Sequence, residues 1–319
     1  MIRNIFLLVL SALAAWSCTA TDDEMPQGPA AGTQPADARN SLCITIAPKP
    51  AFTQAAITMP DGKNSTNTRT LQTEKETKWE KGDVVWLFAK FEDLLTSNIV
   101  SYYSALKYTG TTWRYLTEDE ADEFGLKAFG IYHFNRTLIY DNLGGSGEYR
   151  AEVYAYYTGK GKPDKNGIIT IPSPDSGTSV PVMQASSVSG DFSRPLTLSF
   201  TYQCSRLRIP AGYGLEMANY GYYASYQLGD ESLFGLNYST TPLQLSAANK
   251  DRDVFLLPVA DASGTPVPVT LTLNGGAKWT FTPQLPTGTG TGTGSVADYY
   301  GQSYTLPALG SGSVTPGGM

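Results

Sequence analysis

The chain has 319 residues, 41% of them hydrophobic, so it is long enough for one large or two ordinary domains with buried cores. The net charge is −6, and no cluster of Lys and Arg interleaves with aromatic residues, which argues against a nucleic-acid surface. The 32 Gly and 20 Pro, with short apolar segments between them, favour an all-β sandwich over a helical fold.

The first residues carry targeting information. Arg3 gives a positive start, and the apolar segment Ile5 to Ala15 is too short to span a bilayer as a mature anchor. We therefore interpret residues 1–17 as a secretory signal peptide. It leads into L-A-A-W-S-C, which resembles a bacterial lipobox, in which the cysteine, here Cys18, is diacylated and becomes the new N-terminus. The alternative is an ordinary secreted protein with an incidental cysteine.

The segment after Cys18 predicts surface export and a tether. The acidic run Asp22, Asp23 and Glu24 resembles the signal that sends lipoproteins of Bacteroides-type bacteria to the outer face of the outer membrane, although a solvated charged run is the simpler interpretation. The following residues are mostly Pro, Gly, Ala, Gln and Thr, too polar to bury a core. We expect residues 18–40 to be a lipidated N-terminus and flexible linker.

Folded structure is predicted to begin with a short strand at Leu42. In L-C-I-T-I the aliphatic residues Leu42, Ile44 and Ile46 alternate with Cys43 and Thr45, so one face of the strand is apolar. A polar segment, D-G-K-N-S-T-N-T-R, follows and ends in a single arginine. This order predicts a strand, an exposed linker and an accessible basic residue.

The next segments predict a sheet with one short helix. Gly82 and Asp83 form a turn before a buried strand from Val84 to Ala89. A hairpin is expected around residues 109–111, and then a helix with Thr117 as its N-cap. The acidic residues of that helix lack the spacing of a calcium loop, so they predict a solvated face: Asp119, Glu120, Asp122 and Glu123.

A long alternating segment, L-T-L-S-F-T-Y-Q-C-S-R-L-R-I from Leu196 to Ile209, predicts the opening strand of a second module. Its alternation slips at Ser205 and Arg206, as a β-bulge would make it. A Ser- and Pro-rich run, Ser173 to Ser193, precedes it. We therefore predict two β-sandwich domains in series, residues 41–190 and residues 191–319.

The order of several short motifs resembles that of a known family. The turn W-x-x-G-D at Trp79 to Asp83, before an apolar strand, resembles the fimbrillin family, the Mfa-like pilin lipoproteins of Bacteroidales. Further segments agree with the family in order: A-E-V-Y-A-Y-Y-T from Ala151, V-M-Q-A-S from Val182, the strand from Leu196, D-V-F-L-L-P-V from Asp253, V-T-L-T-L-N-G from Val269 and G-Q-S-Y-T-L from Gly301. The resemblance covers nearly the whole mature chain.

The resemblance implies two transthyretin-like β-sandwiches and assembly into surface pili by exchange of strands between subunits. In that family a protease cuts after an arginine beyond the first strand, the strand leaves, and a strand from another subunit fills the groove. The matching position here is Arg69, with Thr70 as the new first residue. The implied location is the cell surface, on an outer-membrane lipid anchor, and the implied partners are other fimbrial subunits. The resemblance leaves open whether the subunit is stalk, tip or anchor.

An aromatic cluster offers a second reading. Tyrosine rings can stack on sugar faces, and the densest run of them is Tyr220, Tyr222, Tyr223 and Tyr226. Outward-facing tyrosines are also common on strands, which is the simpler explanation. If the cluster faces solvent, the protein is a surface lipoprotein that binds a host or bacterial glycan or protein.

No motif of the chain predicts catalysis, a metal or a cofactor. His133 is the only histidine and is predicted to face solvent from a strand, and no G-x-S-x-G, H-E-x-x-H or phosphate-loop motif occurs. Cys43 and Cys204 have no metal-binding spacing, and a disulfide between them is not favoured. A secreted hydrolase using two of the 29 acidic residues is a third reading. We predict a protein that is not an enzyme.

Overall fold

Strands dominate the folded chain, which confirms the predicted all-β class. The computed structural model describes residues 40–55, 57–58, 64–65, 78–128, 130–144, 148–159, 161–176, 179–229, 233–273, 276–284 and 295–306. All of them belong to one unit of the chain, Asn40–Met319. Within these residues no helix has the length and apolar character needed to cross a membrane.

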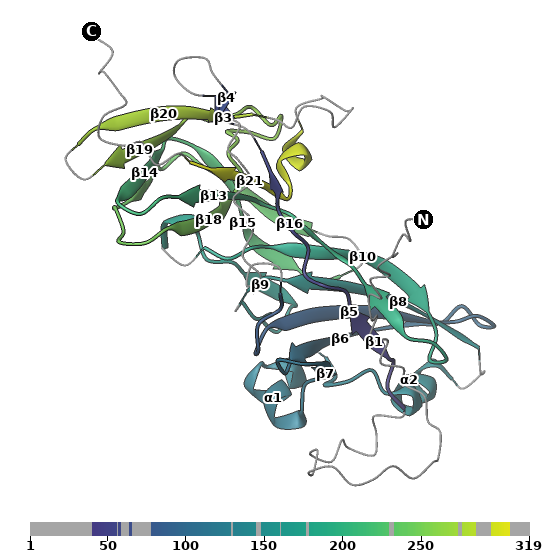
Figure 1. Cartoon of the computed structure of the whole chain (residues 1–319). Coiled ribbons are helices and arrows are strands. Elements are labelled where there is room, and N and C mark those ends of the chain that lie inside the picture. The colour runs from purple at the N-terminus through teal and green to yellow at the C-terminus, as the bar shows by residue number, and fades with distance from the viewer. Residues whose placement is uncertain are drawn as a thin grey trace, which may run out of the picture. The chain divides into compact units, whose positions relative to one another are not determined.

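An antiparallel six-stranded sheet contains most of the first half of the chain (Figure 1). Its strands, in spatial order, are β12 (Phe200–Tyr202), β10 (Met183–Gly190), β8 (Tyr149–Tyr157), β5 (Val84–Asp93), β6 (Ile99–Tyr108) and β7 (Trp113–Tyr115). The hairpin of β6 and β7 turns at residues 109–112, as predicted.

Strand β5 is buried on both faces because two hydrophobic cores meet it. Val85 and Leu87 belong to one core, whereas Val84 and Trp86 belong to the other. Successive side chains of a strand point to opposite faces, so a continuous apolar run supplies both cores at once. The first core also takes Leu42, Ile44 and residues of β8, β10, β11 and β12; the second is completed mainly by strands after residue 205.

The second half of the chain, together with β2, β3 and β4 from near its N-terminus, forms three more sheets of four, six and three strands. One contains β18 (Arg252–Leu256), β13 (Ser205–Ile209), β21 (Gln302–Thr305) and β2 (Thr53–Gln54). The next contains β17 (Leu243–Leu245), β14 (Tyr213–Met217), β19 (Val269–Leu273), β20 (Lys278–Pro283), β3 (Ile57–Thr58) and β4 (Asn64–Ser65). The third contains β16 (Leu233–Ser239), β15 (Tyr220–Gln227) and β9 (Ile168–Thr170). A separate two-stranded pair joins β1 (Ile44–Ile46) to β11 (Leu196–Leu198).

The helices are short, and both α-helices lie between β7 and β8 in the sequence. They are α1 (Glu118–Glu123), α2 (Arg136–Leu143) and the 3-10 turns η3 (Leu126–Ala128), η4 (Pro174–Ser176) and η5 (Val296–Tyr299). The predicted capping box is confirmed: Glu120 N–H donates to Thr117 Oγ1, and Thr117 N–H donates to the Glu120 carboxylate. That carboxylate also accepts from Arg114 and Lys107, and the Arg114 hydrogen bond is the main cause of its lowered pKa.

The long strand predicted from Leu196 to Ile209 is wrong as a single element. The structure divides it into β11, β12 and β13, which pair with β1, with β10, and with β18 and β21 respectively. The alternation of the segment is real, but the chain passes from one sheet to another at Ser199 and again at Gln203 and Cys204. The slip expected at Ser205 therefore marks a change of sheet rather than a bulge.

The predicted division at residues 190 and 191 stays a prediction. Strands β11 and β12 follow that boundary and pair with β1 and β10, which precede it. Strand β9 precedes the boundary and pairs with β15. If the chain is two transthyretin-like sandwiches, at least one of them therefore contains strands from both sides of this boundary.

These crossing pairs predict the behaviour of a chain cut in the exposed turn at residues 191–195. We expect the two pieces to stay together in native gel filtration, because β11, β12 and β9 hold them, and to separate in denaturant. Limited proteolysis followed by gel filtration, with and without urea, is the measurement. Two pieces that elute separately without urea would contradict the observed pairing.

Candidate functional site

The described N-terminal segment, residues 41–55, is extended and adds one strand to each of two sheets. We call it the strap. Its first strand, β1, runs parallel to β11, and its second, β2, runs parallel to β21. Figure 1 shows this segment in purple, running from β1 towards β21. Leu42 and Ile44 enter one hydrophobic core, and Ala55 enters the other. A single short segment therefore contributes to both cores.

The first part of the strap is held mainly through its backbone. Leu42 N–H donates to Phe134 O at 2.9 Å, and the Tyr115 hydroxyl donates to Leu42 O at 2.7 Å. Ala47 N–H donates to Leu198 O at 2.9 Å, which continues the pairing of β1 with β11. The predicted alternation is confirmed at Leu42 and Ile44, which are buried.

The W-x-x-G-D turn, residues 79–83, contacts the middle of the strap. Trp79 Nε1 donates to Ala47 O at 3.0 Å, and the Lys49 ammonium lies over the rings of Trp79 and Tyr157, 5.6 and 5.4 Å from their centroids. Burial lowers the pKa of Lys49, while the carboxylates of Asp83 and Glu80 act in the opposite direction. The W-x-x-G-D motif resembles that of a family, but the sequence alone does not indicate that Trp79 contacts Ala47.

Asp83 fixes this turn and its aromatic neighbour. One carboxylate oxygen accepts from Glu80 N–H at 2.8 Å, and the other accepts from the Tyr157 hydroxyl at 3.1 Å. Gly82 has φ +95°, a left-handed conformation that a residue with a Cβ adopts only with strain. Burial, and then the Asp83 charge, raise the pKa of Tyr157, so this hydroxyl stays a donor.

The last part of the strap is held by an aromatic side chain and by β21. The Phe52 ring stacks on Tyr202, and the Tyr202 hydroxyl donates to Pro50 O at 3.1 Å. Thr53 N–H donates to Gly301 O at 2.7 Å, and Ala55 N–H donates to Ser303 O at 2.9 Å. These bonds make the strap the edge strand of the sheet that contains β21.

The strap contributes a large share of the free energy of folding. Burying an aliphatic or aromatic side chain stabilises by about 1.5–3 kcal/mol, so Leu42, Ile44 and Phe52 together contribute roughly 5–9 kcal/mol as an upper estimate. That is comparable with the whole net stability of a typical domain, about 5–15 kcal/mol. A chain that loses the strap without a replacement is expected to be severely destabilised.

The remaining predicted processing residues lie outside the described part of the chain. These are the lipidation residue Cys18 and the proteolytic pair Arg69 and Thr70. They stay predictions. Between the strap and Arg69 lie β3, which pairs with β20, and β4, which pairs with β3.

The predicted ligand-facing aromatic cluster is wrong for three of its four residues. Tyr220, Tyr223 and Tyr226 are buried, with exposed fractions of 4% or less, and belong to the second hydrophobic core; Tyr222 is half-buried. Their rings pack on one another and on Tyr156 because β15 is covered by other elements. Alternation in the sequence could not show that both faces are covered.

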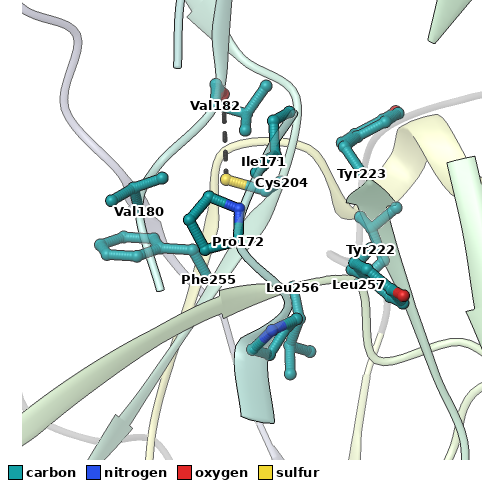
Figure 2. A pocket seen from close by; sticks show the side chains of 11 residues that line it. Ile171, Pro172, Val180, Val182, Cys204, Tyr222, Tyr223, Phe255, Leu256 and Leu257 are labelled. Atoms are coloured by element: carbon teal, nitrogen blue, oxygen red, sulfur yellow. Dashed lines mark hydrogen bonds between the residues drawn. The ribbon is translucent and has the colours of Figure 1, made fainter. Parts of the chain in front are cut away.

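The free thiol of Cys204 lies beside a small cavity rather than in a ligand pocket. Figure 2 shows it among Ile171, Val182 and Tyr223. The cavity of about 10 Å³ has room for about one water molecule. Burial raises the pKa of Cys204 to about 12, so the thiol is unreactive at neutral pH.

Other candidate residues take structural roles. Cys43 and Cys204 do not form a disulfide with each other. His133 lies half-buried in a loop before α2, not on a solvent-facing strand, and its ring meets Tyr132 at a centroid distance of 4.3 Å. Among the described residues, no group of three or more His, Cys, Asp or Glu is arranged to bind a metal ion.

The Trp79 contact predicts a local effect on the strap. Trp79→Phe keeps most of the ring but removes the hydrogen bond to Ala47 O, which is worth about 0.5–1.5 kcal/mol. We expect the amides of residues 45–47 to exchange with solvent roughly two- to ten-fold faster. Trp279→Phe is the control, because Trp279 is also half-buried but packs on Tyr213. Equal amide exchange in both variants would contradict a stabilising hydrogen bond from Trp79 to Ala47 O.

Comparisons with known proteins give similarities among solved structures only. No protein-family model matches the chain. No curated protein matches it. One similar structure is a "putative cell adhesion protein" from Bacteroides thetaiotaomicron, with 12% identity, TM-score 0.39, and coverage of 88% of this chain and 98% of that chain. Another "putative cell adhesion protein", from Bacteroides uniformis, has 15% identity, TM-score 0.37, and coverage of 63% and 78%. A fimbrial protein from Bacteroides ovatus has 12% identity, TM-score 0.33, and coverage of 84% of this chain and 48% of that chain.

Proposed function

We propose that this protein is a structural or accessory subunit of cell-surface fimbriae, a member of the fimbrillin family that is secreted as a lipoprotein and supports adhesion. Its subunits assemble by protease-triggered donor-strand exchange. The observation that carries the proposal is the strap: a short N-terminal segment adds a strand to each of two sheets and contributes side chains to both cores, and a polar segment ending in Arg69 comes after it in the sequence.

The geometry of the strap suits exchange by strand addition. Loss of the segment before Thr70 would leave β11 without its paired strand, β21 without one of its two neighbours, and β20 without β3. Unpaired strand edges accept an extended segment from another chain, and missing side chains leave pockets that such a segment can fill. The same contacts that hold the strap would therefore hold its replacement.

Cleavage alone is not sufficient for this exchange. The strap is held by backbone hydrogen bonds along β11 and β21 and by three buried side chains. A cut strap would stay bound until a donor segment displaces it, since an empty groove costs several kcal/mol of burial. The function therefore needs both a protease and a second subunit.

The names of the similar structures refer to fimbriae and adhesion, and the proposal does not depend on them.

Arg69 is the first residue to test. After treatment with an arginine-specific protease, we expect the wild-type chain to lose the segment before Thr70 and to form ladders that resist SDS. Arg69→Lys should stay uncut and monomeric, because it keeps the charge but not the cleavage site. Arg39→Lys is the matched control, since a cut at Arg39 lies before the strap and leaves it attached.

Two measurements read the outcome of this experiment. N-terminal sequencing of the product identifies the cut, and gel electrophoresis without boiling identifies polymers. A terminal anchor subunit would stay uncut but still bind a partner pilin through its own donor segment. If cut wild-type protein and Arg69→Lys are both monomeric and neither binds a partner pilin, donor-strand exchange is wrong for this chain.

Cys18 tests the anchor separately. We expect the wild-type precursor, expressed in a bacterium with lipoprotein processing, to incorporate labelled fatty acid and to fractionate with the outer membrane. Cys18→Ser should incorporate none and should appear in soluble fractions. Cys43→Ser is the control, because it removes a thiol that lies in the strap and not at the predicted lipidation position. Unchanged labelling of Cys18→Ser would contradict the lipoprotein assignment.

A further inference from the structure

The strap contributes one aromatic ring, that of Phe52, which packs in a socket formed by two aromatic rings and an arginine. The ring is 8% exposed and stacks on Tyr202 with a centroid distance of 3.7 Å and an interplanar angle of 19°. Phe255 of β18 is the second ring of the socket, at 5.8 Å and 28°. The socket is therefore built for a flat side chain.

A buried cation completes the socket. The guanidinium carbon of Arg206 lies 4.8 Å from the centroid of the Phe52 ring, and Arg206 is only 2% exposed. Its Nε donates to Ser303 Oγ at 2.9 Å, and Asp253 lies 3.8 Å from its Nη1. A guanidinium group gains from an aromatic face above it, more so when water is excluded.

Apart from Lys49, whose ammonium lies over the rings of Trp79 and Tyr157, the other contacts of the strap select less by side-chain type. The pairing of β1 with β11 and of β2 with β21 uses backbone groups, which every residue except proline offers in full. Leu42 and Ile44 enter an apolar core, where aliphatic side chains of similar volume replace one another at modest cost. Only at Phe52 do a cation and two rings surround a single side chain.

We propose that the socket of Tyr202, Arg206 and Phe255 is the specificity site of the groove, and that the segment of another subunit that replaces the strap must place an aromatic ring in it. This inference rests on the proposed strand exchange. The incoming segment runs parallel to β11 and β21, as the strap does, with an aliphatic residue at the position of Ile44 and an aromatic residue at the position of Phe52. An aliphatic residue at the second position would leave the guanidinium face uncovered.

A competition experiment with peptides tests the socket without relying on Arg69. A recognition sequence for an unrelated site-specific protease is inserted between Gly62 and Lys63 of the full chain, and the chain is cut there. The cut chain exchanges with a labelled peptide of residues 41–58 in urea just below its unfolding midpoint, followed by dilution. Unlabelled peptides then compete for the groove, and the concentration needed for half-displacement is measured.

Variants of the peptide separate aromatic recognition from simple burial. We expect a Phe52→Leu peptide to compete about ten-fold less well than the parent, and a Phe52→Trp peptide to compete within about three-fold of it. A peptide with cyclohexylalanine at position 52 keeps the size and apolar character but loses the π face, and we expect it to be about five-fold weaker. The matched control is Ala51→Ser, at an exposed position, which should compete like the parent.

The outcomes distinguish this inference from the function on which it rests. If the leucine and cyclohexylalanine peptides compete as well as the parent, the socket does not select aromatic rings and the inference is overturned, while strand exchange stands. If the parent peptide itself never enters the cut chain, both the inference and donor-strand exchange are overturned.

Discussion

The membership of one short segment in two sheets is the constraint on which the structure depends. The strap adds an edge strand at β11 and another at β21, and its side chains reach both hydrophobic cores. Strand β5 of the six-stranded sheet also contributes to both cores, because it is buried on both faces. Because the two cores share elements, loss of the strap weakens both at once. Under the proposed function, this segment is the point at which assembly is controlled.

Several elements could be predicted from the sequence because local patterns decide them. The alternation at Leu42 and Ile44, the apolar run that begins at Val84 and the capping box of Thr117 and Glu120 all appear where the residues predict them. Each depends on neighbours within a few positions, so no distant contact is needed to interpret it. The all-β class follows from the same local signals.

The failures share a different physical cause. Whether Tyr223 faces a ligand or a core depends on what covers β15, which the spacing of tyrosines along one strand does not show. The segment from Leu196 to Ile209 keeps its alternation while changing partner twice, so periodicity alone could not divide it. Trp79 contacts Ala47 of the strap, and Arg206 contacts Phe52 of the strap. Both contacts join residues that are far apart in the sequence, so no local pattern predicts them. The candidate site is thus a product of tertiary pairing.

Chain direction in the strap has a consequence for any polymer built through its groove. Both strap strands run parallel to their partners, and the proposed replacement segment takes the same direction and comes from a different surface of the next subunit than the groove. The interface is then head-to-tail, joining two different surfaces, and such contacts extend into open filaments unless their rotation closes a ring. Every subunit would point the same way. A fibre of this protein would be polar. One end would present a donor segment that occupies no groove, and the other end would present a groove that holds no donor segment.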